Sequence, residues 1–461
     1  MLIPVVIRWI SRRALRWCYR EVCYVGRDRV PGDGATLLFG NHPNDLPDVL
    51  AGFFTTHRPV RYIATISASI LPLAEATYRG LGVIPVTRIR DARKMRARGV
   101  DTASVNRSAF ESVGQAFQDG DIVGVFPEGG VHDSWHIGRP RAGVARMALN
   151  SIDSVSKTDL ILIGFGVQYE APQTLRSDMI ILVGTPFSLR EWVKSESDPS
   201  PAALSERLHT ELMAVGRSSS SWPNAESRNR LVAAVAATNA SGAEPLLEIA
   251  SKFQQRCSDM VEGTDASQVA EGDNVVHWRT ISDELAEWVH RLGGIATSAR
   301  DTARVLDAAG ASNPQALWPS VGWMMATALP AAIGLALNGP LQMGVWRYAR
   351  RTAKVRTDVM ARAILPGLHL IFLGYVVLGV LIALGFRAAS VSSWWALPVV
   401  MLLPRLGDLG LAWRDAADAM RLRARVRRLS VVDRATIRAA ADRVRVAYRH
   451  IGAPSPSSSS L

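Results

Sequence analysis

The sequence predicts an α/β fold, a mostly parallel sheet flanked by helices, followed by a helical region and a C-terminal hydrophobic membrane region. Three observations carry this prediction. In the first part of the chain, short apolar runs alternate with helical patterns, which is typical of a parallel sheet covered by helices. Nearer the C-terminus, long stretches contain no charged side chain. The excess positive charge lies beside those stretches.

The first segment, residues 1–20, predicts an amphipathic helix that lies in a membrane interface. Its apolar start, residues 1–7, is too short for the core of a secretory signal. Arginines then interleave with large apolar side chains such as Trp9 and Trp17, a pattern that favours an interfacial helix. An ordinary surface helix of the following domain is the alternative.

Residues 21–215 predict the α/β domain itself. The carboxyl ends of parallel strands meet at one edge of a sheet, so we expect the functional side chains where strands end. The expected strands are Glu21–Val25, Ala35–Phe39, Arg61–Ile66, Ile122–Phe126, Leu160–Val167 and Met179–Val183, and the expected helices are Ala103–Gln118 and Ala142–Leu149.

A histidine directly follows the second expected strand. His42 has two carboxylates downstream, and either could orient its imidazole as a general base. Asp45 could return to His42 only if the chain turned into a helix at once, which Pro47 disfavours at the preceding residue. Asp48 would lie in the first turn of a helix that Pro47 can start. From the residues alone, both alternatives remain open.

Two further segments carry polar groups after apolar runs. Arg88 and Arg90 follow the apolar stretch at Gly82, and guanidinium groups suit a bidentate grip on a phosphate monoester. Glu128 and Gly129 follow the strand Ile122–Phe126, where a small residue permits close approach of backbone to ligand.

These three segments together resemble the glycerophospholipid acyltransferase superfamily, which carries a phosphate acyltransferase domain. The resemblance covers roughly residues 20–190, and it is greatest to the fungal-type glycerol-3-phosphate/dihydroxyacetone-phosphate 1-acyltransferases. One branch of the superfamily has Asn-His-Pro-Asn, three residues and Asp, which favours Asp48 over Asp45. The matching residues are Asn41, His42, Pro43, Asn44 and Asp48 in the first block, Gly82, Pro85 and Arg88 in the second, and Phe126 to Asp133 with Arg141-Ala142-Gly143 in the third.

The resemblance implies a membrane-bound O-acyltransferase of phospholipid biosynthesis. It would move a fatty acyl group from an acyl thioester to the sn-1 hydroxyl of glycerol 3-phosphate, or alternatively acylate 1-acylglycerol 3-phosphate. A catalytically dead lipid-binding protein is a third alternative. The acyl donor, on coenzyme A or acyl carrier protein, is a co-substrate, and we expect no cofactor. The implied catalytic residues are His42 and Asp48, and the implied substrate-binding residues are Arg88, Arg90, Glu128 and Gly129.

The chain departs from the family pattern in two places. Ile163–Val167 lacks the usual character of the fourth block, and Val131 replaces a serine in the third. An insertion creates the pair His132 and His136, but without a third ligand we expect no metal site.

The rest of the chain predicts a helical region at 223–310, membrane-embedded helices at 311–411 and a basic helical tail at 412–461. Residues 363–386 are uncharged and long enough to span a bilayer. The uncharged stretch 308–346 contains Pro330 and Asn338-Gly339-Pro340, which predict a break and a re-entrant hairpin.

The net charge of +12 is localised in this region. The loop 346–362 carries six basic side chains against one aspartate, and residues 405–450 carry twelve arginines against five aspartates. Basic segments beside membrane helices favour the cytoplasmic face, so we expect a multi-pass membrane protein whose α/β domain is cytoplasmic. Partners would be membrane lipids, the thioester donor and a phosphorylated glycerol acceptor, with no nucleic acid. The three cysteines show no disulfide or metal spacing.

Overall fold

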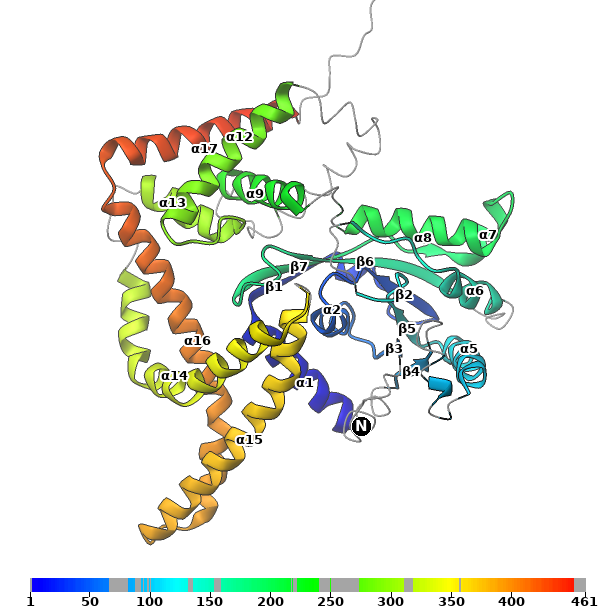
Figure 1. The fold of residues 1–461 in the computed structure, drawn as a ribbon, viewed down its shortest axis with the longest axis horizontal. Coiled ribbons are helices and arrows are strands. Elements are labelled where there is room, and N and C mark those ends of the chain that lie inside the picture. The colour runs from blue at the N-terminus through cyan, green and yellow to red at the C-terminus, as the bar shows by residue number, and fades with distance from the viewer. Residues whose placement is uncertain are drawn as a thin grey trace, which may run out of the picture. The chain divides into compact units, whose positions relative to one another are not determined.

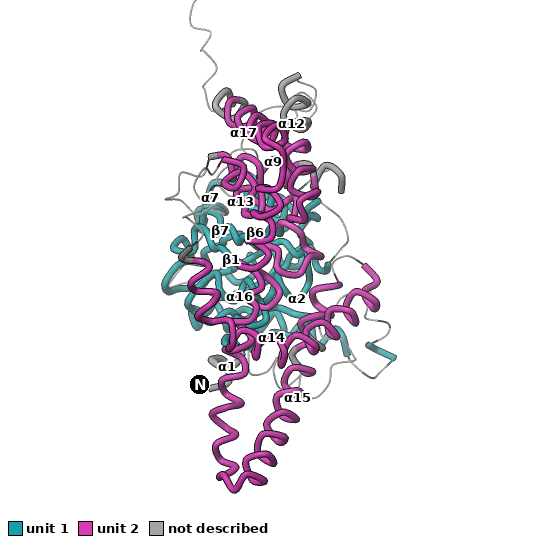
Figure 2. Tube along the Cα trace, turned by 90° about the vertical axis from the view of Figure 1, so that its left-hand side faces the viewer, with its two compact units in different colours: residues 1–15, 22–169, 179–225 teal, residues 16–21, 170–178, 226–461 magenta. Residues whose placement is uncertain are grey.

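The computed structural model divides the chain into two compact units, shown in different colours in Figure 2. Unit 1 comprises Met1–Leu15, Val22–Tyr169 and Met179–Ala225, and unit 2 comprises Arg16–Glu21, Glu170–Asp178 and Glu226–Leu461. The structure describes residues 2–65, 82–87, 93, 95–97, 99, 101–131, 136–152, 159–216, 218, 222–239, 249, 273–310, 318–355 and 358–451.

A mixed, mostly parallel sheet forms the centre of unit 1 (Figure 1). Its strand order is β1-β7-β6-β2-β5-β3-β4, and β8 pairs with β6. The strands from β6 to β4 are parallel, whereas β7 and β8 run antiparallel to β6. The predicted fold class is therefore confirmed. The strands are β1 (Tyr19–Val25), β2 (Thr36–Gly40), β3 (Val60–Thr65), β4 (Ile84–Val86), β5 (Ile122–Val125), β6 (Ile161–Tyr169), β7 (Ser177–Val183) and β8 (Phe187–Ser188).

Four helices pack on one face of this sheet. Their apolar side chains join alternate strand residues, among them Phe39 and Val123, in one buried core. Figure 1 shows a short helix, α2 (Leu46–Gly52), on the side of the sheet opposite α8. The four helices are α5 (Thr102–Gln118), α6 (Ala142–Asn150), α7 (Leu189–Ser195) and α8 (Pro201–Val215).

The N-terminal segment forms the predicted helix, α1 (Leu2–Cys18), and the 3-10 turn η1 (Arg27–Arg29) follows β1. Within unit 1, Arg8 of α1 donates to the carbonyl of Thr56 at 3.3 Å. Trp9 is 53% exposed. The position of α1 in a membrane interface stays a prediction.

Unit 2 is built from helices. In its C-terminal part α14, α15 and α16 pack against one another, and α12, α13 and α17 form a second group. The helices in chain order are α9 (Trp222–Asn239, which begins in unit 1), α12 (Asp273–Arg291), α13 (Ala299–Gly310), α14 (Trp318–Thr352), α15 (Asp358–Ala388), η3 (Ser393–Trp395), α16 (Ala396–Arg427) and α17 (Val431–Ile451).

Three segments of unit 2 within the described ranges are long and apolar enough to cross a membrane. They are Ser320–Thr352, Asp358–Ala388 and Ser393–Arg427. Large apolar side chains such as Phe372 and Leu373 are exposed on them, as expected of surfaces that face lipid. How many of the three span a bilayer stays a prediction.

The predicted re-entrant break is wrong, because α14 is a single helix with Pro330 and Pro340 inside it. Figure 1 shows that α14 bends rather than stops. Packing overrides the Asn-Gly-Pro turn signal. The Asn338 amide donates to the Gly334 carbonyl at 2.9 Å and accepts from the Tyr375 hydroxyl at 2.7 Å.

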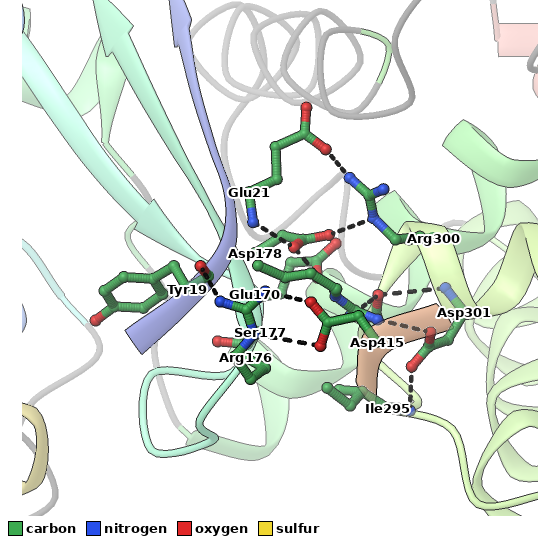
Figure 3. A network of polar contacts seen from close by, with 12 residues as sticks. Tyr19, Glu21, Glu170, Arg176, Ser177, Asp178, Ile295, Arg300, Asp301 and Asp415 are labelled. Carbon is green, nitrogen blue, oxygen red and sulfur yellow. Dashed lines mark hydrogen bonds and ion pairs between the residues drawn. The ribbon is translucent and has the colours of Figure 1, made fainter. Parts of the chain in front are cut away.

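Unit 2 also contains a buried network of ion pairs (Figure 3). Asp178 accepts from the Nε–H of Arg300 at 3.1 Å and forms an ion pair with Arg20, whose Nε lies 3.4 Å from Oδ1. Arg20 also donates from Nη1 to the Asp301 carboxylate at 3.1 Å. Glu170 accepts from the backbone N–H of Ala299 at 3.0 Å. Permanent cations thus surround the aspartates of this network.

Candidate active site

The segment that carries His42 leaves the sheet where β2 ends. The side chain of Asn41 continues the β2–β6 pairing, because its amide donates to the Val167 carbonyl at 3.2 Å and accepts from the Val167 N–H at 2.7 Å. Asn41 is buried, so both of its polar ends are satisfied inside the protein. This contact fixes the direction in which His42 leaves the strand.

A stack of aromatic rings holds the His42 imidazole. Phe126, directly after β5, stacks on His42 with ring centroids 4.1 Å apart, and Tyr62 stacks on the Phe126 ring. Phe165 of β6 contacts Phe126 edge to face. A Cβ atom at Gly40 would lie 2.3 Å from the Phe165 ring, so the last residue of β2 must be glycine for the stack to form.

Asp48 is the carboxylate that contacts the His42 ring. Its Oδ2 lies 2.9 Å from His42 Nδ1 and accepts from the Asn44 N–H at 2.7 Å. Pro47 lies in the first turn of α2, as expected, and Asp48 follows in the same turn. The carbonyl of Asp45, which precedes the helix with φ of 55°, accepts from the Asp48 N–H at 3.1 Å.

The Asp48 carboxylate is fully buried, and its other oxygen accepts a short hydrogen bond from the Tyr169 hydroxyl. Burial raises the pKa of Asp48, whereas the hydrogen bonds from His42, Tyr169 and Asn44 lower it. With Nδ1 directed at Asp48, Nε2 is the ring nitrogen available for proton exchange with a substrate.

Glu128 braces the loops around this histidine. Its Oε1 accepts from the His42 N–H at 3.0 Å and its Oε2 from the Gly138 N–H at 2.7 Å. Arg141 donates to the Glu128 carbonyl at 3.0 Å. Gly129 has φ of +75°, and a Cβ there would lie 2.4 Å from Arg141 Nε, so only glycine fits. The predicted binding roles of Glu128 and Gly129 stay predictions.

The remaining predicted residues are not all described. Arg88, Arg90 and His132 lie outside the described residues. Gly82 and Pro85 lie at β4, beside the strand that contains Tyr62. In the described part of the chain, no group of three potential metal ligands lies close together.

Tyr169 is the residue of this site that the sequence analysis missed. It is the last residue of β6, which runs parallel to β2, so its side chain belongs to the strand-end edge where functional groups were expected. That rule alone could have indicated Tyr169.

Comparison with known proteins agrees with this geometry. Residues 21–164 match the model of the Acyltransferase family. This part of the chain, about a third of its length, is therefore similar to acyltransferase domains.

Two known proteins are similar to parts of this chain. Glycerol-3-phosphate O-acyltransferase 1 of Saccharomyces cerevisiae is 31% identical over 114 residues, which cover 24% of this chain and 14% of the yeast enzyme. The match thus spans a small part of that relative. The crystal structure of the 1-acyl-sn-glycerophosphate acyltransferase PlsC from Thermotoga maritima aligns with 44% of this chain and 75% of its own, at 14% identity and a TM-score of 0.32. A TM-score of this size does not by itself establish a common fold.

Proposed function

We propose that this protein is a membrane-bound O-acyltransferase that moves a fatty acyl group from an acyl thioester to the sn-1 hydroxyl of glycerol 3-phosphate. The observation that carries the proposal is the contact between His42 Nδ1 and the buried Asp48 carboxylate in the matched acyltransferase domain. The similarity to the yeast enzyme supports glycerol 3-phosphate as the acceptor.

In the proposed mechanism, His42 is the general base and the acyl group is transferred directly. Nε2 takes the proton of the acceptor hydroxyl as the oxygen attacks the thioester carbonyl carbon. The carbon–sulfur bond then breaks, and the leaving thiolate takes the proton from Nε2, which returns the imidazole to its neutral form. Asp48 holds the imidazole in the required tautomer and stabilises the imidazolium. No acyl-enzyme intermediate forms.

Tyr169 and Asn44 have a supporting role in this proposal. Both donate to Asp48, so they keep the carboxylate oriented and favour its charged form against the cost of burial. Glu128 positions the backbone of His42 in the same way, through its two bonds to N–H groups. Arg88, with Arg90, would hold the phosphate of the acceptor.

The membrane-embedded part would keep the domain beside its lipid products. Three apolar helices of sufficient length support this, and the basic stretches beside them favour a cytoplasmic catalytic domain. The acyl donor would be a thioester of coenzyme A or of acyl carrier protein, and no cofactor is required.

The decisive experiment offers the purified, detergent-solubilised protein an acyl thioester and one of two acceptors, glycerol 3-phosphate or 1-acylglycerol 3-phosphate. We expect radiolabelled 1-acylglycerol 3-phosphate to form from glycerol 3-phosphate. Transfer only to the acylated acceptor would contradict the proposed substrate while keeping the chemistry. If neither acceptor is acylated by wild-type protein, the alternative of a non-catalytic lipid-binding protein gains support.

A further inference from the structure

Three arginines of unit 1 lie over two aromatic rings. Arg8 and Arg12, one helical turn apart on α1, each place the guanidinium carbon 5.2 Å from the centroid of the Phe54 ring. Arg27 of η1 lies 5.5 Å from the centroid of the Tyr24 ring. We call Arg8, Arg12 and Arg27 the arginine cluster.

The positive charges of the arginine cluster change the pKa values of Arg8 and Tyr24. Burial lowers the pKa of Arg8, and Arg12 and Arg27 lower it further. Burial raises the pKa of the Tyr24 hydroxyl, and all three arginines oppose that shift. The cluster is therefore compact enough for its members to repel one another.

No carboxylate among the described residues neutralises this charge. The polar partner of Arg8 is the neutral carbonyl of Thr56, and no ion pair involves Arg12 or Arg27 in the described part of unit 1. Arg207, by contrast, lies 4.8 Å from the Phe187 ring centroid and also pairs with Glu211 at 2.6 Å. The guanidinium groups of this compact cluster have no carboxylate partner among the described residues. A bound anion would offset their mutual repulsion.

Phosphate is a suitable ligand for the arginine cluster, because guanidinium groups bind its unesterified oxygens through bidentate, charge-assisted hydrogen bonds. Two neighbouring features indicate where the phosphate comes from. Trp9 of α1 is 53% exposed, and the Arg13 guanidinium lies 5.4 Å from its ring centroid. Tryptophan and arginine side chains are typical of the headgroup level of a bilayer. We propose that the arginine cluster binds the phosphate group of an anionic phospholipid.

The position of the cluster makes this lipid a neighbour of the catalytic dyad. The Tyr24 hydroxyl donates at 3.2 Å to the carbonyl of Ala51, in the last turn of α2. Asp48 lies in the first turn of the same seven-residue helix, which is about 10 Å long. A lipid bound here orients the membrane relative to His42 and Asp48.

The test measures thermal unfolding of the full chain in a neutral detergent, with dioctanoyl phosphatidylglycerol or dioctanoyl phosphatidylcholine added. We expect saturating phosphatidylglycerol to raise the midpoint temperature of unfolding, and to raise it by about 3 °C or more beyond the rise caused by phosphatidylcholine. The triple variant Arg8→Gln/Arg12→Gln/Arg27→Gln should lose most of this difference. Arg207→Gln, which removes an arginine that is paired and also faces an aromatic ring, should keep it.

The basic stretches at 346–362 and 405–450 also attract anionic lipid. The deciding quantity is therefore how much the midpoint shift caused by phosphatidylglycerol differs between the variants and wild type. A triple variant that responds like wild type overturns the proposal. So does stabilisation by inorganic phosphate that equals that by phosphatidylglycerol and is lost in the triple variant, because the arginine cluster would then bind a soluble phosphate.

If the triple variant does not fold, the single variant Arg12→Gln decides. Arg12 is exposed, so we expect its loss to leave the unliganded midpoint unchanged or higher and to weaken the affinity for phosphatidylglycerol by about threefold or more. Unchanged affinity in Arg12→Gln would then overturn the proposal. None of these measurements uses acyl transfer, so their outcome is independent of the proposed enzymatic function.

Discussion

Both units of this protein bury carboxylates, but they surround them with different partners. In unit 1, Asp48 accepts from an imidazole, a phenol and a backbone N–H. In unit 2, Asp178 forms ion pairs with the guanidinium groups of Arg20 and Arg300. An imidazole gains and loses a proton near neutral pH, whereas a guanidinium keeps its charge. A buried carboxylate can thus support proton transfer in unit 1 and hold structure in unit 2.

The largest expected effect is the loss of the titratable pair. We expect His42→Ala and Asp48→Asn each to lower kcat by about a thousandfold or more, because the first removes the base and the second its orienting charge. A radiolabelled acyl-transfer assay with glycerol 3-phosphate measures this. Thermal unfolding of the same samples tests whether the variants remain folded.

The matched control is Asp45→Asn, the same chemical change three residues earlier in the same loop. Asp45 contributes its carbonyl to the start of α2, and that backbone group is unchanged in the variant. Asp45→Asn should therefore keep most of the activity. Full activity in Asp48→Asn would contradict the assignment of the dyad.

A smaller effect is expected where a neutral donor to Asp48 is removed. Tyr169→Phe deletes one hydroxyl and keeps the ring, so Asp48 loses a hydrogen bond while the packing at the end of β6 stays. We expect kcat to fall about tenfold, the size expected from losing one hydrogen bond to a charged group.

Steady-state kinetics separate this role from substrate binding. Tyr169 is proposed to act through Asp48, so the KM for glycerol 3-phosphate should stay within about twofold of the wild-type value. A variant with normal kcat and a raised KM would instead place the Tyr169 hydroxyl on the substrate. Combined with Asp48→Asn, Tyr169→Phe should have little additional effect.

The sequence predicted the sheet of unit 1 well, because its strands are continuous apolar runs that end at polar or glycine residues. The six expected strands and two expected helices are present within a few residues of their predicted bounds. The short strands β4 and β8 and the helix α7 were missed, since segments of two to seven residues carry little periodic signal. The longer helix α8 was also not among the expected elements.

The candidate site was predictable only where a local rule or a family motif applied. Asp48 follows from the helix that Pro47 begins together with the family spacing, and the structure has this contact. Tyr169 is 121 residues from Asp48, and the bonds from Glu128 to backbone N–H groups depend on how separate loops meet. The contact that accompanies the continuation of α14 through its Asn-Gly-Pro segment joins Asn338 and Tyr375, which are on different helices. Long-range contacts of this kind leave no spacing in a single sequence.

The smallest expected effect is on the pH dependence of the free energy of unfolding, through a buried carboxylate of unit 2. Burial and the nearby Asp178 charge raise the pKa of Glu170 to about 8, from an ordinary value of 4.5. Between these values the folded state binds more protons than the unfolded state, so the free energy of unfolding falls as pH rises. Asp178, with a pKa raised to about 6, contributes mainly at lower pH.

Glu170→Gln isolates this contribution, because glutamine keeps the shape and does not titrate. Between pH 6.5 and pH 8.5, wild type should lose about 1 kcal/mol more stability than Glu170→Gln, or about 2–4 °C in midpoint. Thermal unfolding in detergent at both pH values measures the difference.

The matching change in unit 1, Asp48→Asn, should lower activity at every pH, whereas Glu170→Gln should leave kcat near the wild-type value. If Glu170→Gln instead abolished acyl transfer, the division between a carboxylate that supports proton transfer by His42 and a structural carboxylate would fail.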